Sequence, residues 1–346
     1  MKRKIVAILV CMTMVFSLAA CGSSSSSTEE AAEETEEEEE DTEEAEEAEE
    51  AEDTAEATGE AKTIALVPPA LTSPYYQSVI SGAEEAVEEL GWTLVTQAPE
   101  TEDDYASQVQ IVEDLITQGV DGIVICAINS EAITTAIKEA NEADIPVVMF
   151  NIDEELTDCE VVTYVTYDQY DAGALVCEWV AENIGTEDIQ VAIVEGSPSS
   201  QSTDRMGGFV DTAEANYPGI EVVASQDGEW LRESGMNAAA NMLTANPDID
   251  VIYGLSDEMA LGALQAVNEA GSDAVCIGFD GNPNAVYSIQ NGGLVATLST
   301  NGTDTGYQTI YALNSYFNGE EVDDMITIEA VMVDETNASE YPSEAD

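Results

Sequence analysis

The 346-residue sequence predicts an α/β protein with two doubly wound parallel-sheet lobes. Short, nearly continuous apolar runs alternate with segments of helical period, a rhythm typical of parallel strands that helices cover on both faces. A less regular stretch at 161–167 interrupts the alternation, which then starts again. Two successive sets of strands and helices fit two sheets better than one, so we expect two lobes with separate cores.

Each element is expected from the spacing of its apolar residues. The first set opens with a strand at 64–67 and a helix at 75–90, which Gly91 ends. It continues with strands at 93–95, 122–126 and 146–150 and helices at 104–118 and 131–141. The second set predicts helices at 171–183, 204–216, 233–245 and 258–269 and strands at 190–194, 221–224, 251–253 and 275–279. Open α/β sheets bind ligands at the carboxyl ends of their strands, so we expect the site in the strand-to-helix loops.

The N-terminus is typical of a bacterial lipoprotein. Basic residues at 2–4 precede an apolar run at 5–20, which is shorter than the ~20 residues of a membrane-spanning helix. Small residues then lead into Cys21, as in a lipobox, where a cysteine receives a diacylglyceryl group. We expect residues 1–20 to be a signal peptide and Cys21 to anchor an extracytoplasmic protein to the outer face of the cell membrane. An ordinary secretory signal with a chance cysteine is the alternative.

Residues 21–61 are expected to form a disordered tether. Serines at 23–27 precede a Glu-rich stretch at 29–60 that lacks aliphatic side chains larger than Ala. Such a segment cannot bury enough apolar surface to offset the entropy of ordering, and its like charges repel. A spacer is therefore preferred to a binding function for this acidic run.

The composition excludes several classes of function. Asp and Glu total 72 against 7 Lys and Arg, and there is no His. Beyond the signal, the basic residues are only Lys62, Lys138, Arg205 and Arg232. They are too few for a phosphate backbone, so no nucleic acid partner is expected. Without His, the commonest general base and metal ligand is missing, and we expect no metal, no cofactor and no enzyme activity.

The cysteines form no metal or redox motif. There is no Cys-x-x-Cys pair. Cys126 and Cys276 fall in predicted strands, Cys177 in a predicted helix and Cys159 in a loop. We expect buried free thiols.

Four stretches of the body, spaced along its whole length, form a recognisable pattern. They are 64–68 with 73–76, 119–125 with 145–151, 204–209, and 256–264 with 278–281. In this order, they resemble the ribose- and galactose-type (type I) periplasmic binding proteins, a fold shared with the sensing cores of lactose-repressor-like regulators. The resemblance covers residues 62 to about 334.

The resemblance implies two lobes joined by a three-strand hinge, with a sugar in the cleft. The crossings fall near Thr166, 300–301 and Ile328. The N-terminal lobe then comprises 62–165 plus 301–327, and the C-terminal lobe 166–300 plus 328–336. Residues 337–346 are a polar tail.

The implied function is capture of a small neutral sugar and its delivery to the membrane subunits of an ABC transporter. The protein is expected to act as a monomer. The alternative is a sugar sensor that presents its ligand to a chemotaxis or kinase receptor. A glycosidase is one rival, since a cleft with several carboxylates could use two acids, but the family pattern and the lack of His count against it. A transcriptional regulator is another, and it would need a helix-turn-helix and a basic face.

Three aromatic residues are the expected stacking partners of the sugar. Tyr75 and Tyr76 open a helix after Ser73 and Pro74, and the resemblance implies that this segment contacts ligand. Trp230 corresponds to an aromatic that stacks on the opposite face of the sugar. For the tyrosines, packing against a neighbouring loop is the alternative.

The loop after the strand at 146–150 carries the next candidates. Asn151 stands where the family usually has an Asp that accepts hydroxyl protons, and an amide can both donate and accept. Ile152 replaces the Arg of the ribose-binding pattern, which puts ribose itself in doubt. Asp153 either supplies a carboxylate from a shifted register or caps a turn, and the sequence leaves both open.

Arg205 and the strand-end acids complete the expected site. Arg205, or Thr203 two residues earlier, corresponds to a residue that reaches ligand or fixes the loop, and Arg205 could also hold Asp204 and nearby carbonyls. Asp280 stands at the family's sugar-binding carboxylate. The remaining candidates follow strands or crossings: Ser256, Asp257 (which could instead be a helix N-cap) and Thr300.

Overall fold

The computed structural model describes residues 60–345. The expected signal peptide, Cys21 and nearly all of the expected tether lie outside these residues. Within 60–345, every helix is too short or too polar to cross a bilayer.

The first lobe is built on a six-stranded sheet whose neighbouring strands are all parallel. Its strand order is β11-β5-β4-β3-β1-β2. Ala65 of the central strand lies opposite Val95 on one side and Ile123 on the other. The strands are β1 (Thr63–Val67), β2 (Thr93–Thr96), β3 (Gly122–Ile125), β4 (Val147–Phe150), β5 (Thr163–Thr166) and β11 (Met325–Thr327).

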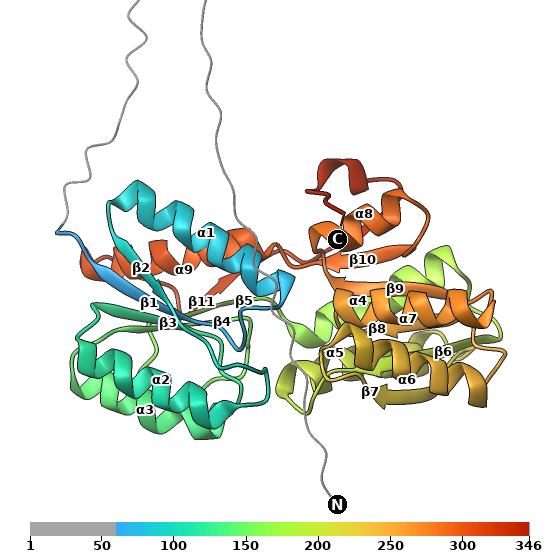
Figure 1. The fold of residues 1–346 in the computed structure, drawn as a ribbon, viewed down its shortest axis with the longest axis horizontal. Helices are drawn as coiled ribbons and strands as arrows, with labels where there is room; N and C mark the ends of the chain where they lie inside the picture. The colour runs from blue at the N-terminus through green and yellow to red at the C-terminus, as the bar shows by residue number, and fades with distance from the viewer. Residues whose placement is uncertain (1–59, 346) are drawn as a thin grey trace, which may run out of the picture. The chain divides into compact units, whose positions relative to one another are not determined.

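Helices cover both faces of this sheet. Helices α1 (Pro74–Leu90) and α9 (Gly302–Phe317) pack against each other on one face, and α2 (Tyr105–Gln118) and α3 (Ser130–Glu142) lie on the other (Figure 1). Gly91 ends α1 as expected, in the left-handed conformation with φ of 67°.

The second lobe repeats the plan with the strand order β12-β10-β9-β8-β6-β7. Only β12 runs antiparallel to its neighbour among these described strands. The strands are β6 (Ile189–Glu195), β7 (Ile220–Asp227), β8 (Val251–Gly254), β9 (Val275–Asp280), β10 (Ala296–Ser299) and β12 (Val331–Asp334). The helices are α4 (Gln169–Asn183), α5 (Ser200–Asn216), α6 (Arg232–Ala245), α7 (Asp257–Ala270) and α8 (Pro283–Gln290), and a short 3-10 turn, η1 (Ala338–Glu340), follows β12. Within this lobe α4 packs against α5, and α6 packs against α7.

The observed architecture confirms the predicted fold class. The chain passes between the sheets after β5, after β10 and after β11. The stretch predicted to be less regular contains β5, and β10, α9, α8 and β11 were not among the expected elements.

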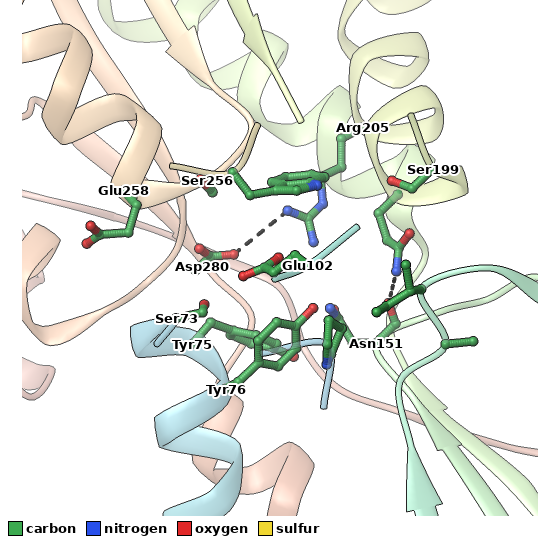
Figure 2. Close-up of a pocket in the computed structure, with 15 residues that line it drawn as sticks. Ser73, Tyr75, Tyr76, Glu102, Asn151, Ser199, Arg205, Ser256, Glu258 and Asp280 are labelled. Atoms are coloured by element: carbon green, nitrogen blue, oxygen red, sulfur yellow. Dashed lines mark hydrogen bonds and ion pairs between the residues drawn. The ribbon is translucent and has the colours of Figure 1, made fainter. Parts of the chain in front are cut away.

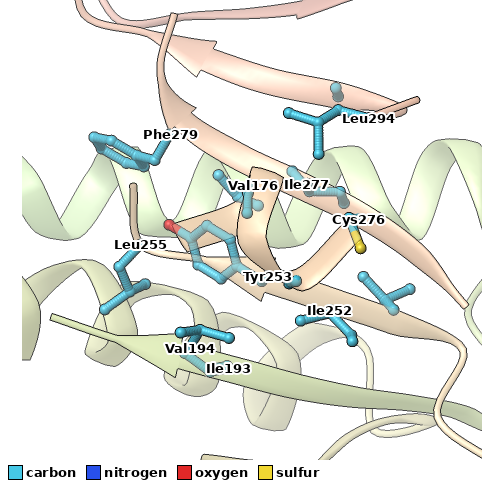
Figure 3. Packing of buried hydrophobic residues seen from close by; sticks show 14 of the residues in the cluster. Val176, Ile193, Val194, Ile252, Tyr253, Leu255, Cys276, Ile277, Phe279 and Leu294 are labelled. Carbon is cyan, nitrogen blue, oxygen red and sulfur yellow. The ribbon is translucent and has the colours of Figure 1, made fainter. Parts of the chain in front are cut away.

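Each lobe has its own apolar core. In the second lobe, Tyr253 of β8 lies among Leu255, Phe279 and the aliphatic side chains of neighbouring strands (Figure 3). Its ring is 5.3 Å from that of Phe209 on α5. Complete burial of such side chains contributes about 1.5–3 kcal/mol each, so the core fixes the strand ends from which the site residues project.

The four cysteines in the described residues are free thiols. Cys126, Cys177 and Cys276 are buried, as predicted. Cys159 is only half-buried, so the expectation of burial was wrong for this residue. It lies in the irregular segment between β4 and β5, outside the layers of sheet and helix.

Glycines allow α4 and α5 to approach closely. A Cβ atom at Gly208 of α5 would overlap the carbonyl oxygen of Tyr170 on α4, and one at Gly173 of α4 would overlap the carbonyl oxygen of Arg205. These contacts set the position of α5, which carries Arg205 to the loops at the strand ends.

We predict that Gly208→Ala lowers the free energy of unfolding by about 1–3 kcal/mol, because the added methyl group forces the two helices apart. Gly207→Ala is the matched control: its Cβ would meet Tyr170 at an ordinary 3.6 Å, and alanine favours the helix by up to about 1 kcal/mol. Urea unfolding of both variants measures the difference. Equal stability of the two variants would contradict the packing argument.

Candidate functional site

A pocket lies where the carboxyl-end loops of the two sheets face each other (Figure 2). Its lining combines tyrosine and tryptophan rings, carboxyl groups, one guanidinium and several amides and hydroxyls. The lining residues are Pro69, Ser73, Tyr75, Tyr76, Glu102, Ala127, Ile128, Asn151, Ser199, Gln201, Arg205, Trp230, Ser256, Glu258 and Asp280.

The structure brings eight of the twelve predicted ligand-binding residues into this lining. They are Ser73, Tyr75, Tyr76, Asn151, Arg205, Trp230, Ser256 and Asp280. Asp153, Thr203, Asp257 and Thr300 lie outside it. Their contact with a ligand stays a prediction.

The tyrosines form the aromatic part of the first lobe's wall. Pro74 begins α1, which places Tyr75 and Tyr76 in its first turn with their rings 5.3 Å apart, edge to face. The ring of Tyr76 also packs edge-on against Phe150 at the end of β4. Both rings are almost fully buried in the lobe, so the ligand would meet rigid surfaces.

Arg205 is the central cation of the pocket and is 3% exposed. Its Nε donates to Oε1 of Gln169 at 2.8 Å, and its Nη1 donates to the Leu255 carbonyl oxygen at 2.7 Å. The guanidinium carbon lies 3.9 Å from the ring centroid of Phe279 and 5.6 Å from that of Trp230. Arg205 therefore lines the pocket and also holds its walls together. These contacts do not include Asp204, the partner that the sequence offered as an alternative.

A hydrogen-bond chain links Arg205 to the first lobe. Arg205 Nη2 donates to the Tyr167 hydroxyl at 2.7 Å, which in turn donates to Asn151 Oδ1 at 3.1 Å. Burial raises the pKa of Tyr167 to about 12, so its hydroxyl keeps its proton over the physiological range. Asn151 has φ of 57°, a left-handed conformation that Asn tolerates well. The chain fixes the Asn151 amide in the lining of the pocket.

Trp230 forms the aromatic part of the second lobe's wall. It follows Glu229 in a turn where both residues have positive φ, of 60° and 55°. The Glu229 amide donates to Asp227 Oδ1 at 2.7 Å, which stabilises this turn. A Cβ at Gly196 would overlap the indole ring, so the glycine makes room for the tryptophan.

Asp280 ends β9 beside the arginine. Its Oδ1 lies 3.8 Å from Arg205 Nη1, and its Oδ2 accepts from the Asn282 side chain at 3.3 Å. Burial raises the pKa of Asp280 to about 7, although the nearby Arg205 acts in the opposite direction. When this carboxyl group is ionised, it can accept hydrogen bonds from the hydroxyl groups of a ligand.

Asp257 has a structural environment. Its Oδ1 accepts from the Thr297 hydroxyl at 2.6 Å, and its Oδ2 accepts from the Asn282 amide at 2.7 Å. Burial raises the pKa of Asp257. The alternative that Asp257 is an N-cap was wrong, because Ser256 is the N-cap of α7 and accepts from the Met259 amide. Asp257 thus fixes the loop that carries Asp280.

Three further candidates also bond to backbone or are enclosed by the fold. Asp153 Oδ2 accepts from the amide of Gln169 at 3.0 Å, at the start of α4. This contact supports the second alternative of the sequence interpretation, a capping role. The exposed Thr203 donates to the Ser199 carbonyl oxygen within α5. Thr300 is buried, and its hydroxyl has no hydrogen-bond partner among residues 60–345.

Sequence reasoning missed several lining residues. Glu102 comes from the loop between β2 and α2, Gln201 and Ser199 from the start of α5, and Glu258 from the first turn of α7. Glu258 is bidentate with Arg232, at 2.7 and 3.0 Å. Gln201 donates to the Asn151 carbonyl oxygen at 3.4 Å. The sequence pattern predicts that this helix starts at 204, which leaves Gln201 out of consideration. The true start of α5 is marked by Ser199, an N-cap that accepts from the Ser202 amide.

The lining is chemically suited to hold a small polar molecule with an apolar face. Aromatic rings from both lobes supply flat surfaces, and the groups between them supply donors and acceptors. Within residues 60–345, no group of three His, Cys, Asp or Glu side chains is arranged to hold a metal ion. The fold and the pocket together define a two-lobed binding protein.

Comparison with known proteins confirms the family resemblance. Residues 64–321 match the periplasmic binding protein domain, and the chain belongs to this family. It is 33% identical over 272 residues to the ribose import binding protein RbsB of Escherichia coli (strain K12), covering 78% of this chain and 90% of that protein. It is 30% identical over 255 residues to the D-allose-binding periplasmic protein of the same organism, covering 71% of this chain and 81% of that protein.

Solved structures agree with the fold. An ABC transporter periplasmic solute binding protein from Actinobacillus succinogenes 130z, with bound D-allose, matches with a TM-score of 0.76 and 32% identity. The match covers 81% of this chain and 100% of that one. A glucose-galactose binding protein from Geobacillus stearothermophilus matches with a TM-score of 0.73 and 26% identity, over 81% of this chain and 99% of that one.

We predict that Tyr167→Phe lowers the free energy of unfolding by about 1–3 kcal/mol, because Arg205 Nη2 and Asn151 Oδ1 each lose a buried partner. Tyr287→Phe, which alters an exposed tyrosine of α8, is the control and should change stability by less than about 0.5 kcal/mol. Urea unfolding at neutral pH provides the measurement. The hydrogen-bond chain is unimportant to stability if both variants unfold at the same urea concentration.

Proposed function

We propose that this protein captures a small neutral sugar in the pocket between its lobes and delivers it to the membrane subunits of an ABC importer. The observation that carries the proposal is that both lobes contribute side chains to one pocket. Tyr75 and Tyr76 come from the first lobe, and Trp230, Arg205 and Asp280 come from the second.

The chemistry of a sugar suits this arrangement. Its C–H faces pack on aromatic rings, and its hydroxyls exchange hydrogen bonds with carboxylate, amide and guanidinium groups. A ligand that contacts both lobes at once stabilises the state in which they meet, so binding shifts the population toward that state. The membrane subunits would recognise the liganded state.

The relatives support a monosaccharide-sized ligand without fixing its identity. Their names specify ribose and D-allose, and one solved neighbour contains D-allose. This chain has Ile152, apolar and buried, where the ribose pattern has an arginine. A hexose, a pentose other than ribose or a polyol is therefore as compatible with the pocket as ribose.

We further infer that the protein binds without turnover and serves import rather than sensing. The family consists of sugar-binding transport proteins, and the two Escherichia coli relatives have names that specify import or binding. We also propose that it is a monomeric lipoprotein, held at the outer face of the cell membrane through Cys21 after removal of a signal peptide. The basic, apolar and small-residue segments at 2–21 support this part of the proposal.

The ligand is identified by a thermal-shift screen of monosaccharides and polyols. A ligand present at hundreds of times its dissociation constant should add roughly 3–4 kcal/mol of stability. We predict that Trp230→Ala and Asp280→Ala each abolish most of this ligand-induced shift, because they remove one stacking face and the carboxylate beside Arg205. Calorimetric titration with the same sugar provides the affinities.

Trp92→Ala is the control for this experiment. Trp92 packs against Phe317 away from the pocket, so its loss should leave the ligand-induced shift intact even if the unliganded protein melts earlier. Full retention of the shift in both pocket variants refutes the assigned site. A panel in which every carbohydrate is inert refutes the function.

The proposed anchor is tested in cells that express the full-length chain. We predict that the protein incorporates a labelled fatty acid and fractionates with membranes, because the diacylglyceryl group binds the bilayer. Cys21→Ser should lose the label and leave the membrane fraction. Cys11→Ser, in the expected signal peptide, is the control and should keep both properties. Labelling that persists in Cys21→Ser would contradict the assignment.

A further inference from the structure

Glu102 is a carboxyl group in the pocket that the four family-like stretches do not include. It lies in the loop between β2 and α2, one residue into a turn closed by the Asp104 amide and the Thr101 carbonyl oxygen, 3.2 Å apart. Asp104 then caps α2 by accepting from the Ser107 amide at 3.0 Å. The turn and the cap together hold Glu102 at the entrance to α2, with its side chain directed toward the pocket (Figure 2).

Glu102 has no ion-pair partner among residues 60–345. Nor does it make a hydrogen bond within this part of the chain. The charged groups that face it are Asp280 at the end of β9 and Arg205 of α5, and Arg205 is already bonded to other parts of the second lobe. The other titratable groups near it are Tyr76 of α1, Cys126 after β3 and, elsewhere in the lining, Glu258, which is paired with Arg232.

We propose, building on the sugar-binding function above, that Glu102 is a specificity-determining ligand contact that donates a hydrogen bond from an uncharged carboxyl group to an oxygen atom of the sugar. One cation, Arg205, faces two carboxyl groups, and the shorter approach is to Asp280. Glu102, the second carboxyl group, is half-buried in the lining and is accommodated there by carrying a proton. A protonated carboxyl group is both a donor and an acceptor, which matches a sugar hydroxyl.

The availability of donors in the pocket supports this role. Arg205 directs three of its five N–H groups to protein oxygens, and the two that remain belong to the second lobe. Asp280 only accepts when it is ionised. The O–H of Glu102 therefore adds a donor on the first lobe, opposite the groups of the second lobe.

The protonation state gives the proposal a pH signature. Burial, and next the charge of Asp280, raise the pKa of Glu102 to about 8, so the group is mostly protonated at pH 7 and mostly ionised at pH 9. Affinity that depends on the proton is full well below pH 8 and falls as pH rises through it, and a contact that contributes about tenfold is weakened by about fivefold between pH 7 and pH 9. Asp280 also titrates, so the informative quantity is the difference between wild type and a Glu102 variant.

The experiment measures the dissociation constant of the sugar with the largest thermal shift, at pH 7 and pH 9. We expect Glu102→Gln, which keeps a donor and an acceptor, to bind within about threefold of wild type at pH 7 and to lose the extra weakening of about fivefold at pH 9. Glu102→Ala should bind about tenfold more weakly at pH 7, the equivalent of one hydrogen bond of about 1.4 kcal/mol. Glu100→Gln, exposed on the same loop, is the matched control and should behave as wild type at both pH values.

The outcomes separate this inference from the proposed function. If Glu102→Ala binds the sugar as tightly as wild type, the inference fails and sugar binding stands. If Glu102→Gln abolishes binding at pH 7 while aminated sugars bind wild type more tightly than neutral ones, Glu102 is ionised and faces a cationic ligand, which also overturns the inference. If no carbohydrate binds wild type at either pH, the proposed function fails, and this inference fails with it.

Discussion

The buried guanidinium of Arg205 is the interaction on which the pocket depends. Removing a cation from water is unfavourable, and here hydrogen bonds to Gln169, Tyr167 and the Leu255 carbonyl oxygen compensate for it. These partners belong to α4, the segment after β5 and the segment after β8. One side chain thereby fixes three loop regions of the second lobe, in a chain with few basic residues.

The same cation explains how two neighbouring carboxyl groups differ. Arg205 lies 3.8 Å from Asp280 and acts against the effect of burial on the pKa of that group. Glu102 has no such pair, and burial raises its pKa to about 8. Of the two acids that face this base, Asp280 has the lower pKa and ionises first as pH rises, which suits it to accepting, whereas Glu102 keeps its proton to a higher pH.

The sequence predicted most of the strands because parallel sheets covered on both faces consist of apolar runs. It failed where a polar residue is buried with a partner that only the folded chain supplies. Thr297 of β10 is fully buried because its hydroxyl donates to Asp257, so the strand does not look apolar. Helix α9, with Gly302, Thr303 and Asp304 in its first turn, likewise has a weak apolar pattern at its start.

The candidate site was predictable where family motifs end a strand, and less so elsewhere. The motif residues Tyr75, Arg205 and Asp280 lie in the pocket, since the motifs specify both a side chain and its place, at the end of a strand for Asp280 and in the first two turns of the following helix for Tyr75 and Arg205. Asp153 belongs to the same loops, but its carboxylate is used by the Gln169 backbone amide, a contact that no linear pattern reveals. Glu102 lies in an acidic loop whose composition does not distinguish it from Glu100 or Asp103.

The distribution of contacts between the lobes is consistent with the proposed closure. The ion pairs of residues 60–345 each join groups within one lobe. The Asn151 carbonyl oxygen accepts from Gln201 of α5 at 3.4 Å and from Gln169 of α4 at 3.1 Å, and neutral bonds of this kind contribute only about 0.5–1.5 kcal/mol each. The Tyr167 hydroxyl also donates to Asn151 Oδ1 at 3.1 Å, and the Asp153 carboxylate accepts from the Gln169 amide at 3.0 Å. The direct links between the lobes at this point are therefore hydrogen bonds and not ion pairs, whereas the partners of Arg205 lie after the first crossing and stay with the second lobe. A ligand that adds contacts to Tyr75, Tyr76 and Glu102 on one side and to Trp230 and Asp280 on the other can then supply the difference in free energy that selects the closed state.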